Sequence, residues 1–207
     1  MVENVKELVV KGKLKLIEGA VQEALDGGAE PADILDSMSA AMDEVGAKFQ
    51  ANEIFVPEML VAAKTMQRGV GKLKPLLGGD AAAKYGKYVI GTVQGDLHDI
   101  GKNLVAMMIE SAGFEVIDLG VDVPASKFVE TLQANPDCKL VGLSALLTTT
   151  MDAMKDTVKA IRDAGLDVKI MVGGAPITQA FCDEIGADAY TTDAASAAEK
   201  AKELATA

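Results

Sequence analysis

The chain has 207 residues, of which 49% are hydrophobic and 25% are charged, and it is long enough to bury one good core or two small ones. Its net charge of -11 argues against a nucleic-acid partner, because nucleic-acid-binding proteins depend on clustered lysine and arginine. No apolar run approaches the ~20 residues that cross a bilayer, and the N-terminus lacks a basic region followed by an apolar core, so we expect a cytoplasmic protein without a membrane partner.

The first part of the chain has the periodicity of helices. Apolar residues recur at three- and four-residue spacing, and glycine or proline interrupts them where helices should begin or end. Pro57 is expected to open the last of these helices, and Pro75 with Gly78 and Gly79 to end it. Short helices with brief connections predict a small helical bundle in residues 1–84, with a linker at 79–84.

From residue 85 the pattern changes to short apolar runs that alternate with amphipathic segments, which predicts strands separated by helices. The expected strands cover residues 88–93, 115–119, 140–144, 168–172 and 189–191. Strands of this kind imply a parallel sheet covered by helices on both faces. Residues 85–207 are therefore predicted to form a flavodoxin- or Rossmann-like α/β domain with strand order 2-1-3-4-5, whose ligand crevice lies between the first and third strands.

The only histidine, His98, lies in the turn after the first predicted strand. A neutral imidazole suits transition metals, although a lone histidine is more often a surface residue or a satisfied core residue. Here Asp96 can accept the second ring N–H and fix the tautomer. Gly101 removes a Cβ where a planar group would approach the backbone. The alternative for Asp96 is a helix N-cap, although Asp99 lies closer to the predicted helix.

Two further turns follow the third and fourth predicted strands. Ser144, Thr148 and Thr150 place hydroxyl groups after the third strand, where they can hydrogen-bond a nucleotide tail; alternatively, one of the threonines caps the next helix. Gly173 and Gly174 follow the fourth strand and let a flat ligand or a phosphate lie against the backbone, although many α/β turns contain glycine. All these turns are expected at the carboxyl ends of strands, where α/β proteins bind ligands.

The order Asp-x-His-x-x-Gly, Ser-x-Leu and Gly-Gly resembles the corrinoid proteins of methyltransferase systems and the cobalamin-binding module of methionine synthase, and the resemblance covers almost the whole chain. It implies that the histidine replaces the cofactor's own benzimidazole as the lower cobalt ligand and that the nucleotide tail lies beside the other two motifs. The residues then expected to bind cobalamin or a related corrinoid are Gly95, Asp96, Leu97, His98, Asp99, Ile100, Gly101, Ser144, Leu146, Thr148, Thr150, Gly173, Gly174 and Ala175.

The same resemblance assigns roles to individual residues. His98 is the implied cobalt ligand and Asp96 its carboxylate partner. Thr150 stands where methionine synthase has a serine, and it would complete a proton relay with these two side chains. Only an unprotonated imidazole coordinates a metal, so the relay would control binding and release of the ligand.

The helical part carries a further likeness. Phe49 and Val56, the second followed by Pro57, match two apolar residues that cap the upper face of the corrin in this family. Ordinary core packing is the alternative, and the neighbouring Phe55 could fill that core position. The cap would have to swing aside for partner proteins, with residues 79–86 as the hinge.

The resemblance implies a non-catalytic carrier subunit rather than a complete enzyme. A substrate:corrinoid methyltransferase would place a methyl group on cobalt(I), and a corrinoid:acceptor methyltransferase would pass it from methylcobalt(III) to tetrahydrofolate or coenzyme M. A reductive activase is a further expected partner. Similar carriers serve methylamines, methanol, methoxylated aromatics and quaternary amines, so the sequence leaves the methyl donor open.

Three alternatives remain at this level. The cobalamin subunit of a radical mutase shares the histidine turn but would not need the helical cap. A cobalamin-dependent sensor would need a DNA-binding element, and no basic helix-turn-helix is visible. A flavodoxin-like domain without cobalt is the third alternative, and failure to take up hydroxocobalamin would favour it.

Overall fold

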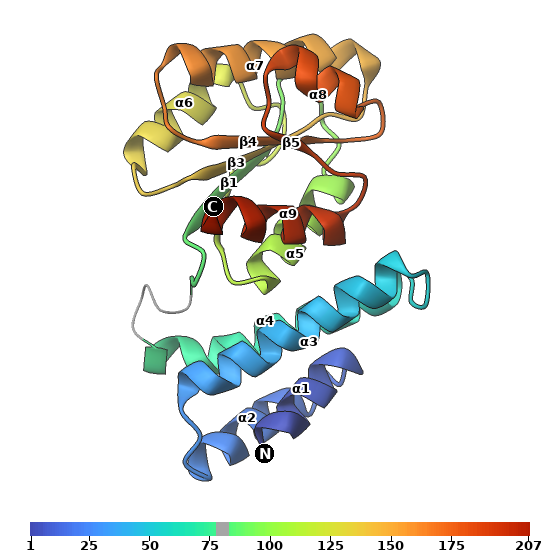
Figure 1. The fold of residues 1–207 in the computed structure, drawn as a ribbon, viewed down its shortest axis with the longest axis vertical. Coiled ribbons are helices and arrows are strands. Elements are labelled where there is room, and N and C mark those ends of the chain that lie inside the picture. Colours follow the sequence, from blue (N-terminus) through green and yellow to red (C-terminus); the bar gives the residue numbers. More distant parts are fainter. Residues whose placement is uncertain (78–82) are drawn as a thin grey trace. The chain divides into compact units, whose positions relative to one another are not determined.

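The computed structural model describes residues 1–77 and 83–207 (Figure 1). The chain forms two compact units, one of residues 1–84 with 110–114 and one of residues 85–109 with 115–207. The linker predicted at 79–84 falls largely on residues outside the described ranges, and the domain boundary at residue 84 stays a prediction.

The helical unit contains four helices in its described part: α1 (Val2–Val10), α2 (Ile17–Asp26), α3 (Pro31–Gln50) and α4 (Val56–Leu77). Helix α3 packs against α1 and α4, and α2 packs against α1 and α4. Each helix turns one apolar stripe inward, which is why the three- and four-residue spacing was informative. Side chains that are completely buried here include Val5, Val9, Ile17, Val21, Ile34, Met38, Met59 and Leu73.

The predicted ends of the last helix differ from those of α4. The helix begins at Val56, one residue before the expected start, and it includes Pro75 and continues to Leu77. Proline lacks an N–H group and therefore loses one helical hydrogen bond. Because Pro75 lies in the last described turn, this loss does not interrupt the helix, so Pro75 does not end it as expected. Gly78 and Gly79, which were expected to end the helix with Pro75, lie outside the described residues.

The second unit contains a five-stranded parallel sheet in the order β2-β1-β3-β4-β5, which confirms the predicted α/β class and strand order. The strands are β1 (Lys87–Thr92), β2 (Glu115–Asp118), β3 (Leu140–Ser144), β4 (Lys169–Gly173) and β5 (Ala189–Tyr190). In the register of the sheet, Ser144 pairs with Thr92 on one side and with Gly173 on the other. The last residues of β1, β3 and β4 therefore form one row at the carboxyl edge.

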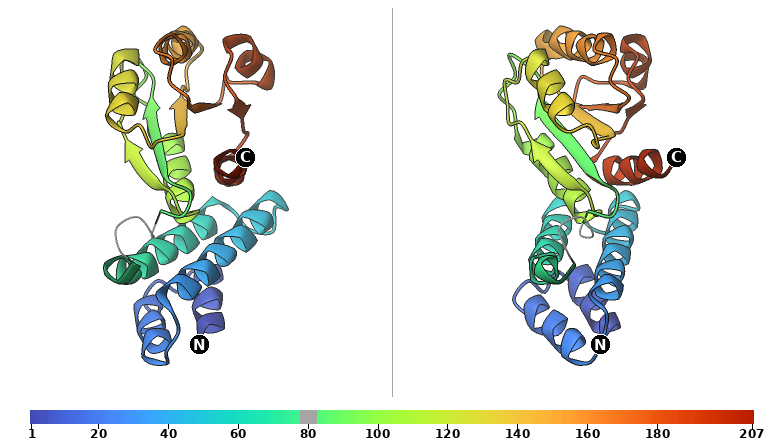
Figure 2. Two further views of the ribbon diagram at one scale, coloured as in Figure 1. Left: turned by 60° about the vertical axis from the view of Figure 1, so that its left-hand side comes forward. Right: turned by 90° about the vertical axis from the view of Figure 1, so that its left-hand side faces the viewer.

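Helices cover both faces of this sheet, as Figure 1 shows and as Figure 2 shows from two other sides. They are α5 (Ile100–Ser111), α6 (Ala125–Ala134), α7 (Met151–Asp163), preceded by the short helix η1 (Thr148–Thr150), α8 (Gln179–Ile185) and α9 (Ala194–Thr206). Helices α6, α7 and α8 lie on one face, and α5 and α9 lie on the other. The core beneath the first group contains Val89, Val141 and Ile170 from the strands, and Phe128 and Val158 from the helices.

None of the helices in the described part of the chain combines the length and the apolar composition needed to cross a membrane.

Candidate functional site

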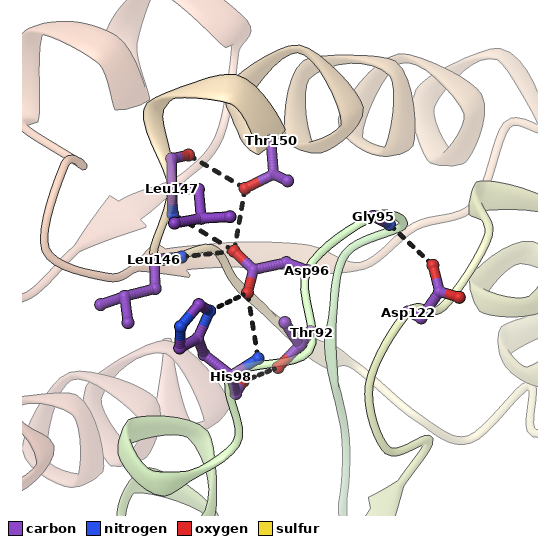
Figure 3. Close-up of polar contacts among 8 residues, drawn as sticks. All are labelled: Thr92, Gly95, Asp96, His98, Asp122, Leu146, Leu147 and Thr150. Carbon is purple, nitrogen blue, oxygen red and sulfur yellow. Dashed lines mark hydrogen bonds and ion pairs between the residues drawn. The ribbon is translucent and has the colours of Figure 1, made fainter.

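The loop after β1 holds a fully buried carboxylate next to a half-exposed imidazole. The side chain of Asp96 has no exposed surface, whereas half of the His98 side chain is exposed. Asp96 Oδ1 accepts a hydrogen bond from the His98 backbone N–H at 3.0 Å and lies 2.7 Å from His98 Nδ1 (Figure 3). The carboxylate favours the tautomer with the proton on Nδ1 and leaves Nε2 with the lone pair that ligates a metal.

The second oxygen of Asp96 is held by the loop after β3. Oδ2 accepts hydrogen bonds from the backbone N–H of Leu146 at 2.7 Å and of Leu147 at 3.3 Å, and from Thr150 Oγ1 at 2.8 Å (Figure 3). Burial would raise the pKa of Asp96, but the hydrogen bonds from the Leu146 amide, the His98 amide and the His98 ring hold that pKa well below its usual range. Asp96 is therefore a carboxylate at neutral pH.

Thr150 links this carboxylate to the backbone of its own loop. Its hydroxyl oxygen lies 2.8 Å from Asp96 Oδ2 and 2.9 Å from the carbonyl oxygen of Leu147. A hydroxyl has one proton, so Thr150 donates to one of these acceptors at a time. Thr150 occupies the N-cap position of α7 but makes no side-chain capping hydrogen bond, so the capping alternative is wrong for this residue.

The capping alternative is also wrong for Asp96. Helix α5 begins at Ile100, four residues further along the chain, and the Asp96 carboxylate is fully occupied by His98 and the loop after β3.

Apolar side chains beside the imidazole are exposed. Leu97 and Ile100 are 72% and 84% exposed, and Leu146 and Leu147 are 43% and 40% exposed. These residues flank His98 in the chain or bond to Asp96 through their amides. Exposed apolar side chains around a polar group favour a ligand that covers them, because burying apolar surface is favourable. The surroundings of the imidazole therefore suit a large, mainly apolar ligand.

Two of the predicted glycines adjoin open space. A Cβ atom at Gly101 or Gly173 would meet no other heavy atom within 4 Å, and neither residue has a positive φ. Gly101 lies inside α5, where glycine lowers helix stability. Nothing within the protein explains these two glycines, and both leave room for a ligand close to the backbone.

Gly174 differs from them. Its φ is +131°, and a Cβ atom there would lie 1.8 Å from the carbonyl oxygen of Ala145. The protein's own packing therefore requires this glycine. Ser144 and Gly173 lie at the same sheet edge as the Asp96 loop, and Thr148, Gly174 and Ala175 are exposed beside them.

The two predicted cap residues belong to the helical unit. Phe49 lies in the last turn of α3 and is half-buried, and Val56, the first residue of α4, is 39% exposed. Phe55 is 65% exposed, so the alternative in which it fills the core is wrong. The turn between α3 and α4 presents Phe55 and Val56 to solvent.

Two residues that sequence reasoning missed also hold the loop. The buried Thr92 donates from Oγ1 to the carbonyl oxygen of His98 at 2.9 Å. Asp122, in the loop after β2, accepts a hydrogen bond from the Gly95 N–H at 2.7 Å (Figure 3). A hydroxyl in an otherwise apolar strand was the available signal for Thr92. No sequence signal pointed to Asp122.

The donor set limits how a metal could be held. No group of three or more histidine, cysteine, aspartate or glutamate side chains suited to a metal occurs among the described residues. A metal bound to His98 would need its remaining ligands from another molecule, as in a macrocycle. The single imidazole, the apolar surroundings and the two glycines beside open space fit a corrin ring.

Comparisons with known proteins agree with this geometry. Residues 86–201 match one family described as a B12 binding domain, and residues 1–74 match a second family with the same description. The chain belongs to the corrinoid proteins of methyltransferase systems. It is 44% identical to dimethylamine corrinoid protein 1 of Methanosarcina acetivorans over 209 aligned positions, which cover 99% of this chain and 97% of the relative.

Solved structures show the same fold in related corrinoid proteins. A cobalamin-binding protein of Desulfitobacterium hafniense has a TM-score of 0.83 at 32% identity and covers 99% of this chain and 98% of its own. A chain of the methanol:cobalamin methyltransferase complex of Methanosarcina barkeri has a TM-score of 0.86 at 28% identity, with 98% of this chain and 78% of that chain covered. The present corrinoid protein accordingly binds cobalamin or a related corrinoid.

Proposed function

We propose that this corrinoid protein is a methyl carrier in which His98 is the lower ligand of the corrinoid cobalt. The contact between Asp96 and His98 is the observation that carries the proposal, since the buried carboxylate leaves Nε2 of the half-exposed ring as the ligating atom. When bound, the corrinoid cobalt supplies the nucleophile that accepts a methyl group and later gives it up.

We propose that Asp96, His98 and Thr150 control the proton that decides whether the imidazole can bind cobalt. When the ring is not coordinated, we propose that a proton moves onto the network of Asp96, His98 and Thr150, because only an unprotonated imidazole coordinates a metal. Thr150 Oγ1 donates to Oδ2 of the Asp96 carboxylate and also lies within hydrogen-bond distance of the Leu147 carbonyl oxygen. We propose that the hydroxyl switches from the first acceptor to the second when a proton is held between Asp96 and His98. We propose that this network sets when the imidazole binds and when it leaves.

The other predicted residues form the rest of the proposed site. Ser144, Thr148 and Gly173, with Leu97 and Ile100 along the ring, would contact the corrinoid and its nucleotide tail at the carboxyl edge. The helical domain, residues 1–84, would supply the cap with Phe49 and Val56. The exposure of Val56 at the turn between α3 and α4 supports this assignment, because an apolar side chain that is 39% exposed gains from being covered.

The methyl donor that we propose is a methylated amine, because relatives that align over the full chain are dimethylamine corrinoid proteins. The partners would be a methylamine:corrinoid methyltransferase, a second methyltransferase that serves coenzyme M or tetrahydrofolate, and a reductive activase. The likeness to a chain of a methanol:cobalamin methyltransferase complex supports a carrier that docks with a separate methyltransferase.

Because the chain has one histidine, a labelling experiment addresses the ligand directly. Protein grown with ¹⁵N-histidine and reconstituted with hydroxocobalamin is reduced to the cobalt(II) state, and its EPR spectrum is recorded. Coordination by His98 predicts that the superhyperfine triplet of ¹⁴N becomes the doublet of ¹⁵N. An unchanged triplet would mean that the corrinoid keeps its own base and would end the proposal. His98→Ala is the control variant that should lose the label effect.

The donor is tested separately. The reconstituted protein is reduced to cobalt(I) and mixed with a purified dimethylamine methyltransferase and dimethylamine, and the absorbance change to the methylated state is followed. Methanol with its own methyltransferase is the matched control. Methylation in the methanol reaction alone would overturn the assignment of the donor while leaving the carrier function intact.

A further inference from the structure

A single aspartate outside the motif holds the backbone of the ligand loop. Asp122 lies in the loop between β2 and α6, and its Oδ1 atom accepts a hydrogen bond from the Gly95 N–H at 2.7 Å (Figure 3). Its own backbone N–H donates to the carbonyl oxygen of Asp96 at 2.9 Å. Two hydrogen bonds thus join one residue to the two positions that immediately precede Leu97 and His98.

The hydrogen bond from the Gly95 N–H to the Asp122 carboxylate joins two residues whose backbone conformation is unusual. Asp122 has a φ of 54° and Gly95 a φ of 83°, both in the left-handed region. Among the described residues other than glycine, only Asn52 and Asp122 have a positive φ. Aspartate tolerates this conformation better than most residues, although it is still a sparsely populated one. A strained residue persists where surrounding contacts hold it, and such residues concentrate at functional sites.

Contacts on either side keep Asp122 in place. The N–H of Thr92 donates to the carbonyl oxygen of Gly120, and the N–H of Val123 donates to the carbonyl oxygen of Thr92, both at 3.0 Å. These bonds extend the pairing of β1 and β2 beyond the strands themselves. Asp122 therefore projects from a segment that is tied to the end of β1 two residues before and one residue after it.

Asp96 is consequently held from two directions. Its backbone carbonyl accepts from Asp122 on the β2 side, and its carboxylate accepts from Leu146 and Thr150 on the β3 side. The carboxylate reaches His98 Nδ1 only while the backbone of Asp96 keeps this position between the two loops.

We propose that Asp122 is a positioning residue for the Asp96–His98 pair. It acts through the backbone of Gly95 and Asp96 rather than on the imidazole itself. The role in corrinoid binding rests on the proposed function, whereas the effect on the imidazole tautomer does not. A purely structural role, in which Asp122 only stabilises its own turn, would change the stability of the domain but leave the imidazole as it is.

Three substitutions separate the two properties of Asp122, its side-chain oxygen acceptor and its left-handed backbone conformation. Asp122→Asn keeps an oxygen acceptor and tolerates the left-handed backbone. Asp122→Gly keeps the backbone freedom but removes the acceptor. Asp122→Ala removes both. Asp167→Gly is the matched control, because Asp167 is an exposed loop aspartate just before β4, at the opposite edge of the sheet.

The first measurement uses the protein without corrinoid. The ¹⁵N shifts of the His98 ring, the only histidine signals, report which nitrogen carries the proton. We expect the Nδ1–H tautomer in the natural protein, in Asp122→Asn and in the control. We expect a mixture of tautomers in Asp122→Gly and Asp122→Ala.

The second measurement is hydroxocobalamin affinity, followed by absorbance. Substitutions of residues that orient a metal ligand typically lower metal affinity by about 10- to 100-fold. Asp122 acts one residue further from the metal, so we expect a smaller loss of affinity, about three- to tenfold in Asp122→Gly, and none in Asp122→Asn.

The outcomes distinguish the positioning role of Asp122 from the proposed ligation of cobalt by His98. Wild-type ring shifts in a folded Asp122→Gly protein would overturn the positioning role, and so would failure of that protein to fold, because Asp122 would then serve the whole domain. If the ring shifts change as expected but the EPR label effect is absent in the natural protein, Asp122 still positions the pair and ligation by His98 is what fails.

Discussion

Thr150 Oγ1 donates a hydrogen bond to Asp96 Oδ2 at 2.8 Å, although 54 residues separate the two in the chain. Both side chains are buried, and the contact joins the loop after β1 to the loop after β3. Loss of either partner removes a hydrogen bond to a buried charged group, which contributes more to stability than a hydrogen bond between neutral groups. A substitution of Thr150 is therefore expected to alter the position of the Asp96 carboxylate and, through it, the hydrogen bond between Asp96 and His98.

The first prediction concerns the hydroxyl of Thr150. Thr150→Val keeps the shape but removes the donor, and we expect it to lower the free energy of unfolding by about 1.5–3 kcal/mol, the usual contribution of a hydrogen bond to a charged group. Thr150→Ser keeps the donor and loses one methyl group, which is worth at most about 0.8 kcal/mol. Urea unfolding of the three proteins measures the difference. Equal losses for valine and serine would show that packing, and not the hydroxyl, matters here.

The second prediction is a pH dependence carried by Asp96. Because the pKa of Asp96 in the folded protein lies below its ordinary value of 3.8, the carboxylate stabilises the fold above that pH and loses this contribution as the pH falls toward the folded pKa. The free energy of unfolding of Asp96→Asn should therefore fall furthest below that of the natural protein at neutral pH. This difference between the two proteins should become smaller below about pH 4, where the natural protein loses the contribution of the Asp96 carboxylate.

Urea unfolding at a series of pH values tests this dependence. Asp167→Asn, at an exposed position, is the control and should show no comparable gap at any pH. A gap for Asp96→Asn that stays constant down to the acid unfolding limit would contradict the prediction.

The third prediction separates folding from binding at Gly101. A Cβ atom at this position enters open space, and the residue lies inside α5. Gly101→Ala should therefore raise the stability of the protein without cofactor by about 0.5–1 kcal/mol, the helix preference of alanine over glycine. If the open space is where the corrin lies, the same substitution should weaken hydroxocobalamin binding. A more stable protein with unchanged affinity would place the ring elsewhere.

The fourth prediction compares the two glycines after β4. Gly174→Ala places a Cβ atom 1.8 Å from the Ala145 carbonyl oxygen at a φ of +131°, so it should destabilise the fold by more than about 3 kcal/mol, combining overpacking with backbone strain. Gly173→Ala meets nothing within 4 Å and should fold normally while binding corrinoid less tightly. Thermal unfolding and absorbance titration check the pair. If Gly173→Ala were the less stable of the two proteins, the distinction between Gly174, required by packing, and Gly173, which leaves room for the ligand, would be wrong.

The sequence by itself determined the class of the fold. Alternation of apolar runs with amphipathic segments is a local property, and it predicts parallel strands covered by helices on both faces. The order β2-β1-β3-β4-β5 was predicted because five strand–helix units suit the flavodoxin-like topology. Local rules were weaker at element ends, where Pro75 is accommodated in the last described turn of α4.

The sequence also determined the pair Asp96 and His98, because the two residues are only two positions apart and a tight turn brings them together. Of the partners of Asp96 in the loop after β3, Thr150 was implied by the family resemblance, whereas the backbone amides came from the tertiary structure alone. The amides of Leu146 and Leu147 reach the carboxylate because the register sets Ser144 beside Thr92, and backbone amides have no signature in sequence. Asp122 joins the site through its hydrogen bond from the Gly95 N–H, with its own backbone in the left-handed conformation. Such contacts depend on how separate strands align, which residue spacing along one chain does not encode.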